Sequence, residues 1–587
     1  MSGLSGYPGT KSAACTPPLL VRLGAAVIPL ALVTIAALWR VWFLRQGVLA
    51  IDKDEAIVGL MGLYILAGDR PVFFYGQSYL GSAEAYLHAA VFAILGASSI
   101  TLRIVPLLIS LVCVYLVYRL GSTLYSRDIG IISGVYLALS PVFFTMWSLR
   151  ARLAFLELLA IGTALILLAL RLQRGCAPPW LPFLFGLLLG LGLWTNQLIL
   201  LYIPALFILL VGKPTRYGVI QTMIAGLGTF IGGLPLWLTN ISHGNGTIRN
   251  LQAMYTSQFP GLPGIPGYRE MIISHLHTGL PVLTGFFQPH DPPIDWNLLI
   301  PYPMGDRIAP IAICTTLVLI AAMLVIKNCI QLIKRDCTAS MQYIRGELAL
   351  AMHFLAVPLI VYAATISAYQ AASPRYLLLL YSCVPLFVNA VMRGIEWLLA
   401  RVKQICAHIF LPLWINDAHT WSIVLFTLAI GVNVRGHTGV QYSWTAKLSD
   451  EHLQNLAHYL YQRDVTAFYA EDWITYPLMF LSRGQLVGSL PGCFWRIDSD
   501  HARVAAAPKG AWIVTDPRTE ASVLEQLQNA GASYARENMV GFTVIYDVVP
   551  TSALPICRPG APPVPAAGAS AEPVGDAGPE SAAEQAP

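Results

Sequence analysis

The chain has 587 residues, of which 56% are hydrophobic and only 11% are charged. Soluble globular proteins carry about 25% charged residues, so this composition excludes a protein built around one large water-soluble core. It indicates a polytopic membrane protein. The formal net charge of +5 identifies no partner, because in membrane proteins the placement of Lys and Arg carries more information than their sum.

Apolar segments recur along the first three quarters of the chain. A membrane-spanning helix needs about 20 mostly apolar residues. The segment Ala85–Leu95 is apolar but only about half that length, which predicts a helix lying at the membrane interface. The segments 180–195 and 197–212 are short, which favours tilted or broken helices. The sequence predicts eleven spans, at 19–44, 103–124, 129–147, 154–172, 180–195, 197–212, 218–239, 308–326, 348–368, 375–399 and 409–433.

The basic residues between these spans predict the orientation. With the N-terminus inside, the inner loops collect most of the Lys and Arg, as the positive-inside rule requires. Counting 85–95 as a span would reverse that pattern. These inner basic residues are Arg119, Arg127, Arg171, Arg174, Lys213, Arg216, Lys327, Lys334, Arg335, Arg345, Arg393, Arg401 and Lys403.

Eleven spans place the C-terminus outside and leave two long outer loops, 46–99 and 240–307. The predicted division is a cytoplasmic tail at 1–18, a transmembrane domain at 19–433, an extracytoplasmic domain at 434–557 and a tail at 558–587. That tail is rich in Ala, Pro, Gly and Glu, a composition typical of disorder.

The region after residue 440 has a different pattern. Helix-like stretches at 450–463 and 520–530 alternate with short β-like runs at 466–469, 512–515 and 542–549, which predicts a small α/β domain. It contains neither a P-loop nor GxGxxG, so no nucleotide site is predicted there. Cys493 and Cys557 could pair, although no spacing rule supports a disulfide.

Acidic residues gather at the predicted outer edge of the membrane. Asp54, Glu55 and Glu84 lie in the first outer loop, and Glu157 lies at the outer start of the span 154–172. Carboxylates at a dry boundary can act as a general base, orient an acceptor or hold a divalent ion. Asp54 and Glu55 beside an apolar run favour such a role. Asp52 alone is explained as well by solvation of the surface, and we interpret it as a bystander.

Several arginines break the positive-inside pattern. Any one of them is explained by ordinary snorkelling at the interface. As a set beside the acids they favour a pocket for an anionic head group, because a guanidinium binds phosphate oxygens in a bidentate way. Acids and arginines at one outer site predict a reaction on a phosphorylated lipid, with a carboxylate activating an acceptor. The arginines are Arg40, Arg45, Arg103, Arg150, Arg152 and Arg375.

At these residues the chain resembles a known family. The motifs are DEA at Asp54–Ala56, FFYGQSYLGSAEAYL from Phe73, LRIVPLL at Leu102–Leu108, the acid Glu157 and SPRYLLLLY at Ser373–Tyr381. Their order resembles the GT-C glycosyltransferases, and within them the bacterial protein-mannosyltransferase and aminoarabinose-transferase-like group (glycosyltransferase family 39-like). The resemblance covers residues 20–400 and is strongest over 50–175.

The resemblance implies a polyprenyl-phosphate-linked sugar donor, transfer on the extracytoplasmic side and inversion at the anomeric carbon. It implies that Asp54, with Glu55 beside it, is the general base or orients the acceptor. Glu157 falls where the family has a second acid, commonly Asp. Arg375 and Tyr376 match an Arg-Tyr pair near the donor phosphate. Divalent metal use varies among these enzymes, so a possible metal ion stays open.

Other residues complete the predicted site. Tyr75, Gln77 and Glu84 are candidates for sugar binding, and Arg103, Arg150 and Arg152 for the departing phosphate. The expected partners are the lipid-linked donor, a lipid, glycan or protein acceptor, and the plasma membrane, with no nucleic acid. The alternatives are a transporter or flippase of a lipid-linked sugar, and a non-catalytic scaffold. Transporters place ionisable groups near the bilayer midplane, whereas here they gather at its edge. The sequence names neither sugar nor acceptor.

Overall fold

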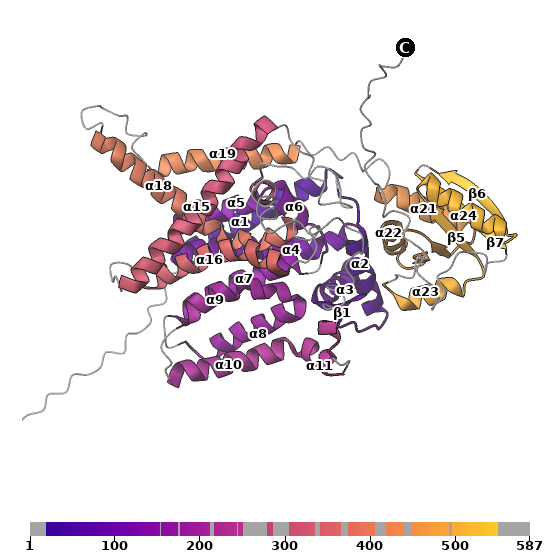
Figure 1. Cartoon of the computed structure of the whole chain (residues 1–587), viewed down its shortest axis with the longest axis horizontal. Coiled ribbons are helices and arrows are strands. Elements are labelled where there is room, and N and C mark those ends of the chain that lie inside the picture. The colour runs from indigo at the N-terminus through magenta and orange to yellow at the C-terminus, as the bar shows by residue number, and fades with distance from the viewer. Residues whose placement is uncertain are drawn as a thin grey trace, which may run out of the picture. The chain divides into compact units, whose positions relative to one another are not determined.

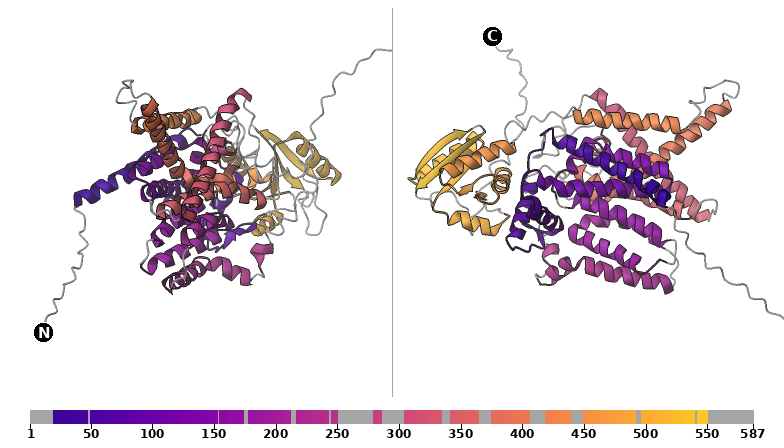
Figure 2. Two further views of the ribbon diagram at one scale, coloured as in Figure 1. Left: turned by 60° about the vertical axis from the view of Figure 1, so that its left-hand side comes forward. Right: turned by 180° about the vertical axis from the view of Figure 1, so that it is seen from behind.

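The computed structural model describes two units, Met1–Ala446 and Lys447–Pro587, each treated by itself below (Figures 1 and 2). The described residues are 19–47, 49–152, 154–173, 177–211, 216–242, 245–249, 279–285, 304–334, 341–364, 374–405, 418–438, 449–491, 496–539 and 541–549. The predicted tails 1–18 and 558–587, most of the loop 240–307, and both Cys493 and Cys557 lie outside them.

In its described residues, the first unit is helical apart from one small hairpin. Three of its segments, η1, η2 and η4, are 3₁₀-helices that lead directly into α-helices. Its elements are α1 (Leu19–Leu44), α2 (Lys53–Leu66), β1 (Phe73–Phe74), β2 (Gln77–Gly81), α3 (Ala83–Leu95), η1 (Thr101–Arg103), α4 (Ile104–Leu124), α5 (Arg127–Ala138), α6 (Val142–Trp147), α7 (Phe155–Leu172), α8 (Trp180–Thr195), η2 (Gln197–Tyr202), α9 (Ile203–Leu210), α10 (Arg216–Gly232), α11 (Leu234–Ser242), α14 (Leu280–Leu283), α15 (Met304–Lys334), α16 (Met341–Ala364), η4 (Pro374–Cys383), α18 (Val384–Ile405) and α19 (Ala418–Thr438).

Within the described part of the chain, six helical segments are long and apolar enough to cross a membrane. A seventh arises if α10 and α11, bent by 63° at their junction, form one span. The helix Ala83–Leu95 is too short to span by the same measure, as its sequence predicts. The six are Ala26–Leu44, Thr101–Leu124, Phe155–Leu172, Ile308–Lys334, Met341–Val361 and Pro374–Arg401.

The structure differs from the predicted set in the segment 129–147. The segment predicted as one span at 129–147 forms two helices, α5 and α6, with a break before Pro141, where the missing amide hydrogen of proline ends the regular hydrogen bonding. The segments 180–195 and 197–212 form the short helices α8 and η2–α9, as the prediction of tilted or broken helices allowed. The predicted span 409–433 lies partly outside the described residues.

Glycines bring α8 and α10 close together, and the two helices lie side by side in Figure 1. A Cβ on Gly186 would lie 1.9 Å from the carbonyl oxygen of Ala225, and one on Gly232 would lie 2.1 Å from that of Leu187. Neither position tolerates a side chain. Small residues at such crossings let helix backbones approach in membranes, where water provides no hydrophobic drive for association.

The core of the first unit lies where α4, α7, α16 and η4 meet. Its largest fully buried side chains include Trp147, Tyr202 and Phe144. The ring of Tyr202 fills the space above Gly162, where a Cβ would lie 2.1 Å from it. This packing fixes the start of α7 and the chain just before it, which carry residues of the candidate site.

The second unit has a five-stranded sheet in the order β4-β3-β5-β7-β6. Strands β3, β4 and β5 are parallel, whereas β7 is antiparallel to both β5 and β6. Each predicted helix-like stretch and β-like run of this region coincides with a helix or strand to within a few residues. The elements are α21 (Asp450–Gln462), β3 (Ala467–Tyr469), α22 (Asp472–Leu481), β4 (Val487–Ser489), α23 (Asp498–Ala505), β5 (Gly510–Val514), α24 (Pro517–Asn529), β6 (Ser533–Met539) and β7 (Phe542–Val549).

Candidate active site

The acidic stretch forms the start of α2 and is fixed there by reciprocal capping. The side chain of Asp52 accepts hydrogen bonds from the backbone amides of Asp54 (2.9 Å) and Glu55 (3.0 Å). The carboxylate of Glu55 accepts one from the backbone amide of Asp52 at 3.2 Å. This capping box satisfies helix amides that have no partner within the helix. It sets the direction in which the three acids leave the backbone.

Glu55 is fully buried and binds two arginines from distant parts of the chain. Arg103 pairs with one of its oxygens, and Arg150 with the other at 2.8 Å. The amide of Ala151 donates to Glu55 at 3.2 Å, and Arg103 donates to the carbonyl oxygen of Leu149 at 3.0 Å. The segment between α6 and α7 is therefore attached to α2 and to the start of α4.

Asp52 completes this network. It pairs with Arg150 at 2.6 Å and with both the Nε (3.0 Å) and a terminal nitrogen of Arg152. Burial by itself raises the pKa of Asp52, but the guanidinium groups of Arg152 and Arg150 outweigh burial and hold that pKa well below its usual range. Asp52 is thus ionised and engaged, whereas the sequence suggested a bystander.

Asp54 is the second residue of α2 and is half-buried. Its charge acts on Arg152, together with the charges of Asp52 and Glu55. A carboxylate at this position also faces the positive end of the helix dipole. The predicted base therefore lies beside the ion-pair network, whose arginines hold the two neighbouring acids.

A second group of titratable side chains lies behind the first, on α3 and α7. Glu84 is 3% exposed, and its Oε1 lies 3.4 Å from Nε2 of the fully buried His88. Burial raises the pKa of Glu84 to about 8, and burial lowers the pKa of His88 to about 3. At neutral pH both groups are therefore uncharged. The carboxyl group of Glu157, in the first turn of α7, is a close neighbour of both.

Arg375 and Tyr376 lie in the first turn of η4 and connect to the network through edge-to-face ring contacts. The guanidinium of Arg375 lies 5.0 Å from the ring centre of Tyr376, which meets Phe155 at 5.8 Å. Phe155 meets Trp147 at 5.1 Å, and the guanidinium of Arg152 lies 5.1 Å from the Trp147 ring. The Nε of Arg375 is buried and has no hydrogen-bond partner in the part of the chain that the structure describes.

Tyr75 and Gln77 lie on the β1–β2 hairpin, directly before the helix that carries Glu84. The hydroxyl of Tyr75 donates to the carboxylate of Asp69, and Gln77 opens β2 opposite Phe74. Trp194 of α8 donates to the carbonyl oxygen of Val72 at 3.0 Å. At Gly81 a Cβ would lie 2.5 Å from the carbonyl oxygen of Trp194. The hairpin is therefore held tightly against α8.

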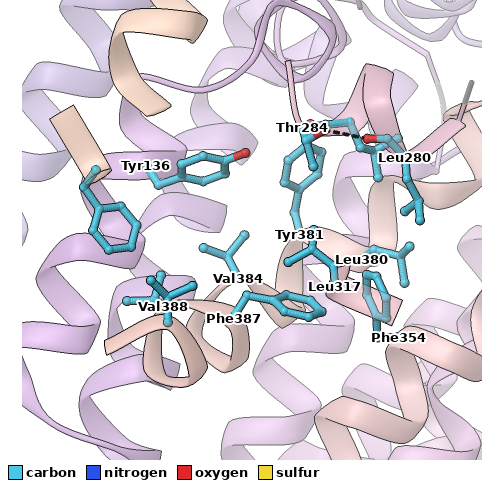
Figure 3. Close-up of a pocket in the computed structure, with 13 residues that line it drawn as sticks. Tyr136, Leu280, Thr284, Leu317, Phe354, Leu380, Tyr381, Val384, Phe387 and Val388 are labelled. Carbon is cyan, nitrogen blue, oxygen red and sulfur yellow. Dashed lines mark hydrogen bonds between the residues drawn. The ribbon is translucent and has the colours of Figure 1, made fainter. Parts of the chain in front are cut away.

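An apolar cavity of about 180 Å³ lies further along η4 and α18 (Figure 3). The hydroxyl of Tyr136 points toward Tyr381 across it. The hydroxyl of Tyr381 donates to the carbonyl oxygen of Leu283, and that of Thr284 to Leu280. The hydroxyls of Tyr381 and Thr284 in its wall are thus hydrogen-bonded within the protein. The remaining lining is mostly apolar, so the cavity suits a hydrocarbon chain. Other lining residues are Leu317, Phe354, Leu380, Val384, Phe387 and Val388.

The structure brings most predicted residues into one region but separates two arginines from it. Asp54, Glu55, Arg103, Arg150 and Arg152 gather around the start of α2. Arg40 instead points into the helix bundle, where it is fully buried, and Arg45 is exposed. The residues that sequence reasoning missed are Asp52 and Trp147. The Asp-x-x-Glu spacing of a capping box could have identified Asp52, but no local signal marks Trp147.

Among the residues that the structure describes, no three His, Cys, Asp or Glu side chains form a group that could hold a metal ion. The close neighbours Glu84, His88 and Glu157 do not meet this geometry. The possible divalent metal therefore has no ligand set in these parts of the chain.

Comparisons with known proteins agree with this architecture. Residues 83–243 match the family model described as dolichyl-phosphate-mannose-protein mannosyltransferase. Among curated protein sequences, none matches the chain significantly. The crystal structure of ArnT from Cupriavidus metallidurans in the apo state is 10% identical, with a TM-score of 0.54 over 92% of this chain and 100% of that one.

Two further solved structures are similar at lower scores. They are ArnT from Cupriavidus metallidurans bound to undecaprenyl phosphate (TM-score 0.49, 10% identity, 90% of this chain and 98% of that one) and the apo oligosaccharyltransferase of Archaeoglobus fulgidus (TM-score 0.43, 12% identity, 78% and 64%). The match to the mannosyltransferase model and the ArnT-like fold together confirm the resemblance of this chain to the GT-C glycosyltransferases.

Proposed function

We propose that the protein transfers a sugar from a polyprenyl-phosphate donor to an acceptor hydroxyl or amine in a single displacement. A bond forms between the acceptor atom and C1 of the sugar while the bond from C1 to the phosphate oxygen breaks. Asp54 takes the acceptor proton, and the prenyl phosphate leaves with its electron pair. One displacement at C1 inverts the anomeric configuration.

The observation that carries this proposal is that, of three neighbouring acids, two are held in buried ion pairs. Asp52 and Glu55 are buried in ion pairs with Arg103, Arg150 and Arg152, so they are poor proton acceptors. Asp54 lies beside them at the start of α2 and, unlike the fully buried Glu55, is half-buried. The network fixes the helix end that carries Asp54, as a positioned general base requires.

Arg375 is the residue we assign to the departing phosphate. Its buried Nε lacks a protein partner among the described residues, and a guanidinium suits phosphate oxygens. The charges of Arg103, Arg150 and Arg152 add a positive field close by. The matching family model is named for dolichyl-phosphate-mannose, a donor in which a sugar is linked to a prenyl phosphate.

The apolar cavity supports a prenyl chain in the donor. Tyr381 of its wall lies six residues after Arg375 on the same 3₁₀-helix, a rise of about 12 Å. Val384, Phe387 and Val388 continue the wall along α18. A phosphate at Arg375 would therefore have an apolar space within reach of its first isoprene units.

The remaining predicted residues complete the assignment. Tyr75, Gln77 and Glu84 would contact the sugar from the hairpin and α3, and Glu157 would act as the second acid. The site would face the extracytoplasmic side of the plasma membrane, as the predicted charge pattern of the loops requires. Lipid, glycan and protein acceptors remain equally compatible with these residues.

The test replaces Asp54 by Asn and measures sugar release from a labelled polyprenyl-phosphate sugar in the presence of acceptor extracts. General-base help is worth about 10²–10⁴ in rate, so transfer should fall by that factor in a protein that still folds. Asp128→Asn is the matched control. Asp128 is also the second residue of its helix, α5, but it is exposed, and transfer should persist.

Two outcomes would overturn the proposal. Full activity of Asp54→Asn would remove the assigned base. Movement of the intact donor across vesicles, with no release of prenyl phosphate, would favour the alternative of a flippase.

A further inference from the structure

Arg40 is a charged side chain in the interior of a candidate membrane span, α1, and is fully buried. It makes no ion pair within the described residues; every bond it forms is to a neutral oxygen. Its Nε donates to the hydroxyl of Ser148 at 3.0 Å, and one terminal nitrogen donates to the carbonyl oxygen of Ala36 at 3.0 Å. Burying a charge without a counter-ion is costly, so this placement calls for a reason beyond packing.

The other bonds of Arg40 lead to the break between α5 and α6. The carbonyl oxygens of Ala138 and Leu137, at the end of α5, accept from Arg40 at 3.2 and 3.4 Å. Asn433 of α19 donates to the next carbonyl oxygen, that of Leu139, at 2.8 Å. The last carbonyls of a helix have no partner within it, and inside a membrane no water replaces that partner. Side chains of α1 and α19 therefore make the broken helix possible.

Side chains of α1 and α19 also hold the short helix α6, within the helix and at its C-terminal end. His437 of α19 contacts the hydroxyl of Thr145 at 2.9 Å, and the hydroxyl of Ser148 donates to the carbonyl oxygen of Thr145 at 2.6 Å. Because Ser148 also accepts from Arg40, the end of α6 is attached directly to α1. The guanidinium of Arg40 lies 5.6 Å from the centre of the Phe144 ring of α6.

The chain after α6 leads at once into the candidate active site. Ser148 is followed by Leu149, whose carbonyl binds Arg103, and by Arg150, which pairs with Asp52 and Glu55. Only one residue separates Ser148 from Arg150. A shift of Ser148 would therefore move Arg150 relative to the start of α2.

We propose that Arg40 is a positioning residue for the transfer reaction, acting through the α5–α6 break and Ser148 on Arg150 and Arg152. It touches neither substrate nor reacting atoms. It holds the segment 148–152 at the position in which the arginines fix Asp52 and Glu55, and hence the helix end that carries Asp54. The inference rests on the proposed function for its kinetic consequence, but its structural half can be tested without any substrate.

The simpler interpretation is that Arg40 only joins α1 to α5. Loss of that contact would lower the amount of folded protein and leave the kinetic constants of the remaining molecules unchanged. A positioning role predicts a change in those constants at equal folded protein, since small misplacements of catalytic groups cost up to about 10²-fold in rate.

The experiment compares Arg40→Met, Arg40→Lys and Ser148→Ala with wild type in detergent. We expect Arg40→Met to lower kcat/KM for the prenyl-phosphate donor by about 10- to 100-fold per folded molecule. Arg40→Lys should keep more of the wild-type kcat/KM than Arg40→Met does. Ser148→Ala removes one of the hydrogen bonds of Arg40, together with the bond from the Ser148 hydroxyl to the carbonyl oxygen of Thr145. It leaves the other bonds of Arg40 in place and should show a smaller loss in the same direction, in a protein that folds. Arg119→Met is the control, since Arg119 also lies in a candidate span but its guanidinium contacts Tyr115, one turn away in the same helix.

Amide hydrogen exchange supplies a readout that needs no activity. Peptides covering 148–152 should exchange faster in Arg40→Met and in Ser148→Ala, while peptides of α8 stay unchanged. Unaltered exchange at 148–152, or normal kcat and KM per folded molecule in all three variants, would overturn the inference. Absence of transfer by the wild type would count against the proposed function, and the exchange data would still decide whether Arg40 holds this segment.

Discussion

Two buried acids, Glu55 and Glu347, anchor polar clusters at opposite ends of α4. Arg103, a partner of Glu55, directly precedes that helix. At its other end, the ring of Tyr125 meets Tyr343, whose hydroxyl donates to Glu347 at 3.0 Å. The helix has 21 residues, about 31 Å at 1.5 Å per residue, so a bilayer thickness separates the clusters.

The partners of the two acids differ in charge and in origin. Glu347 accepts from neutral groups of Asn328 (2.9 Å) and Tyr343, and from Lys327 (2.9 Å), whose side chain is 47% exposed. The partners of Glu55 are guanidinium groups that are at most 4% exposed and lie 48 and 95 residues away in the chain.

This difference indicates that the Glu347 cluster is a structural contact and that the Glu55 cluster belongs to a functional site. A buried ion network is weak evidence for stability, because removing charges from water costs about as much as their attraction returns. The Glu347 cluster joins the neighbouring helices α15 and α16 with little desolvation of charge, because its cation, Lys327, is about half exposed and its other partners are neutral. The Glu55 cluster keeps five charged side chains out of water at the start of α2, which points to a role in function. They are Asp52, Glu55, Arg103, Arg150 and Arg152.

Among the changes that test the difference between the two clusters, Glu55→Gln should have the largest effect on stability and on transfer. The change leaves Arg103 and Arg150 buried with one carboxylate fewer, and breaking a buried pair in this way costs about 3–5 kcal/mol. We expect a lower unfolding temperature in detergent and less transfer per folded molecule. A variant as stable and as active as wild type would show that the network is dispensable.

Glu347→Gln is the matched change at the other cluster and should have a smaller effect. The amide oxygen can still accept hydrogen bonds, and the exposed amine of Lys327 stays hydrated. We expect a loss of about 1–3 kcal/mol and unchanged kcat and KM. If this variant lost transfer at equal folded protein, the assignment of a purely structural role to the Glu347 cluster would be wrong.

The smallest effect is expected from Glu84→Gln, which should change how the stability of the protein depends on pH. Its pKa is about 8 in the folded protein against 4.5 for the ordinary group. Between these values the unfolded chain releases the proton and the folded protein keeps it, so the contribution of Glu84 to stability is fully present below pH 4.5 and falls as the pH rises toward 8. Glu84→Gln removes this dependence.

Unfolding temperatures measured from pH 5 to 8.5 should therefore fall less steeply in Glu84→Gln than in wild type. The comparison with wild type cancels the opposite contribution of His88, whose pKa is lowered to about 3. Parallel curves for the two proteins would contradict the buried, neutral state of Glu84.

The spans that were predicted well are those in which a long apolar run coincides with one helix. Examples are α4, α7 and α15, where composition alone decides burial in a membrane. The prediction failed at α5 and α6 because a break needs partners for its carbonyl groups, and these come from Arg40 and Asn433. Neither is visible from hydropathy. Three of the five C-terminal strands, β3, β5 and β7, coincide with predicted β-like runs, whereas β4 and β6 were not predicted.

The sequence predicted which residues make up the candidate site but not which acid pairs with which arginine. The acids of α2 stood out in the sequence because they lie beside an apolar run, and the arginines near Arg150 because they break the positive-inside pattern. Which acid pairs with which arginine depended on folding, since Asp52 and Arg152 are 100 residues apart. That pairing turned Asp52 from a predicted bystander into a central member of the network.

The sequence by itself determined the membrane class, most spans, the resemblance to GT-C glycosyltransferases and the stretch that carries Asp54, Glu55 and Glu84. These are local properties of composition, periodicity and motif. Only the tertiary structure decided that Arg103, Arg150 and Arg152 hold Asp52 and Glu55, and that Arg40 points inward to a broken helix. Such contacts depend on how helices pack, because buried charges take whichever partner the packing places within hydrogen-bonding distance.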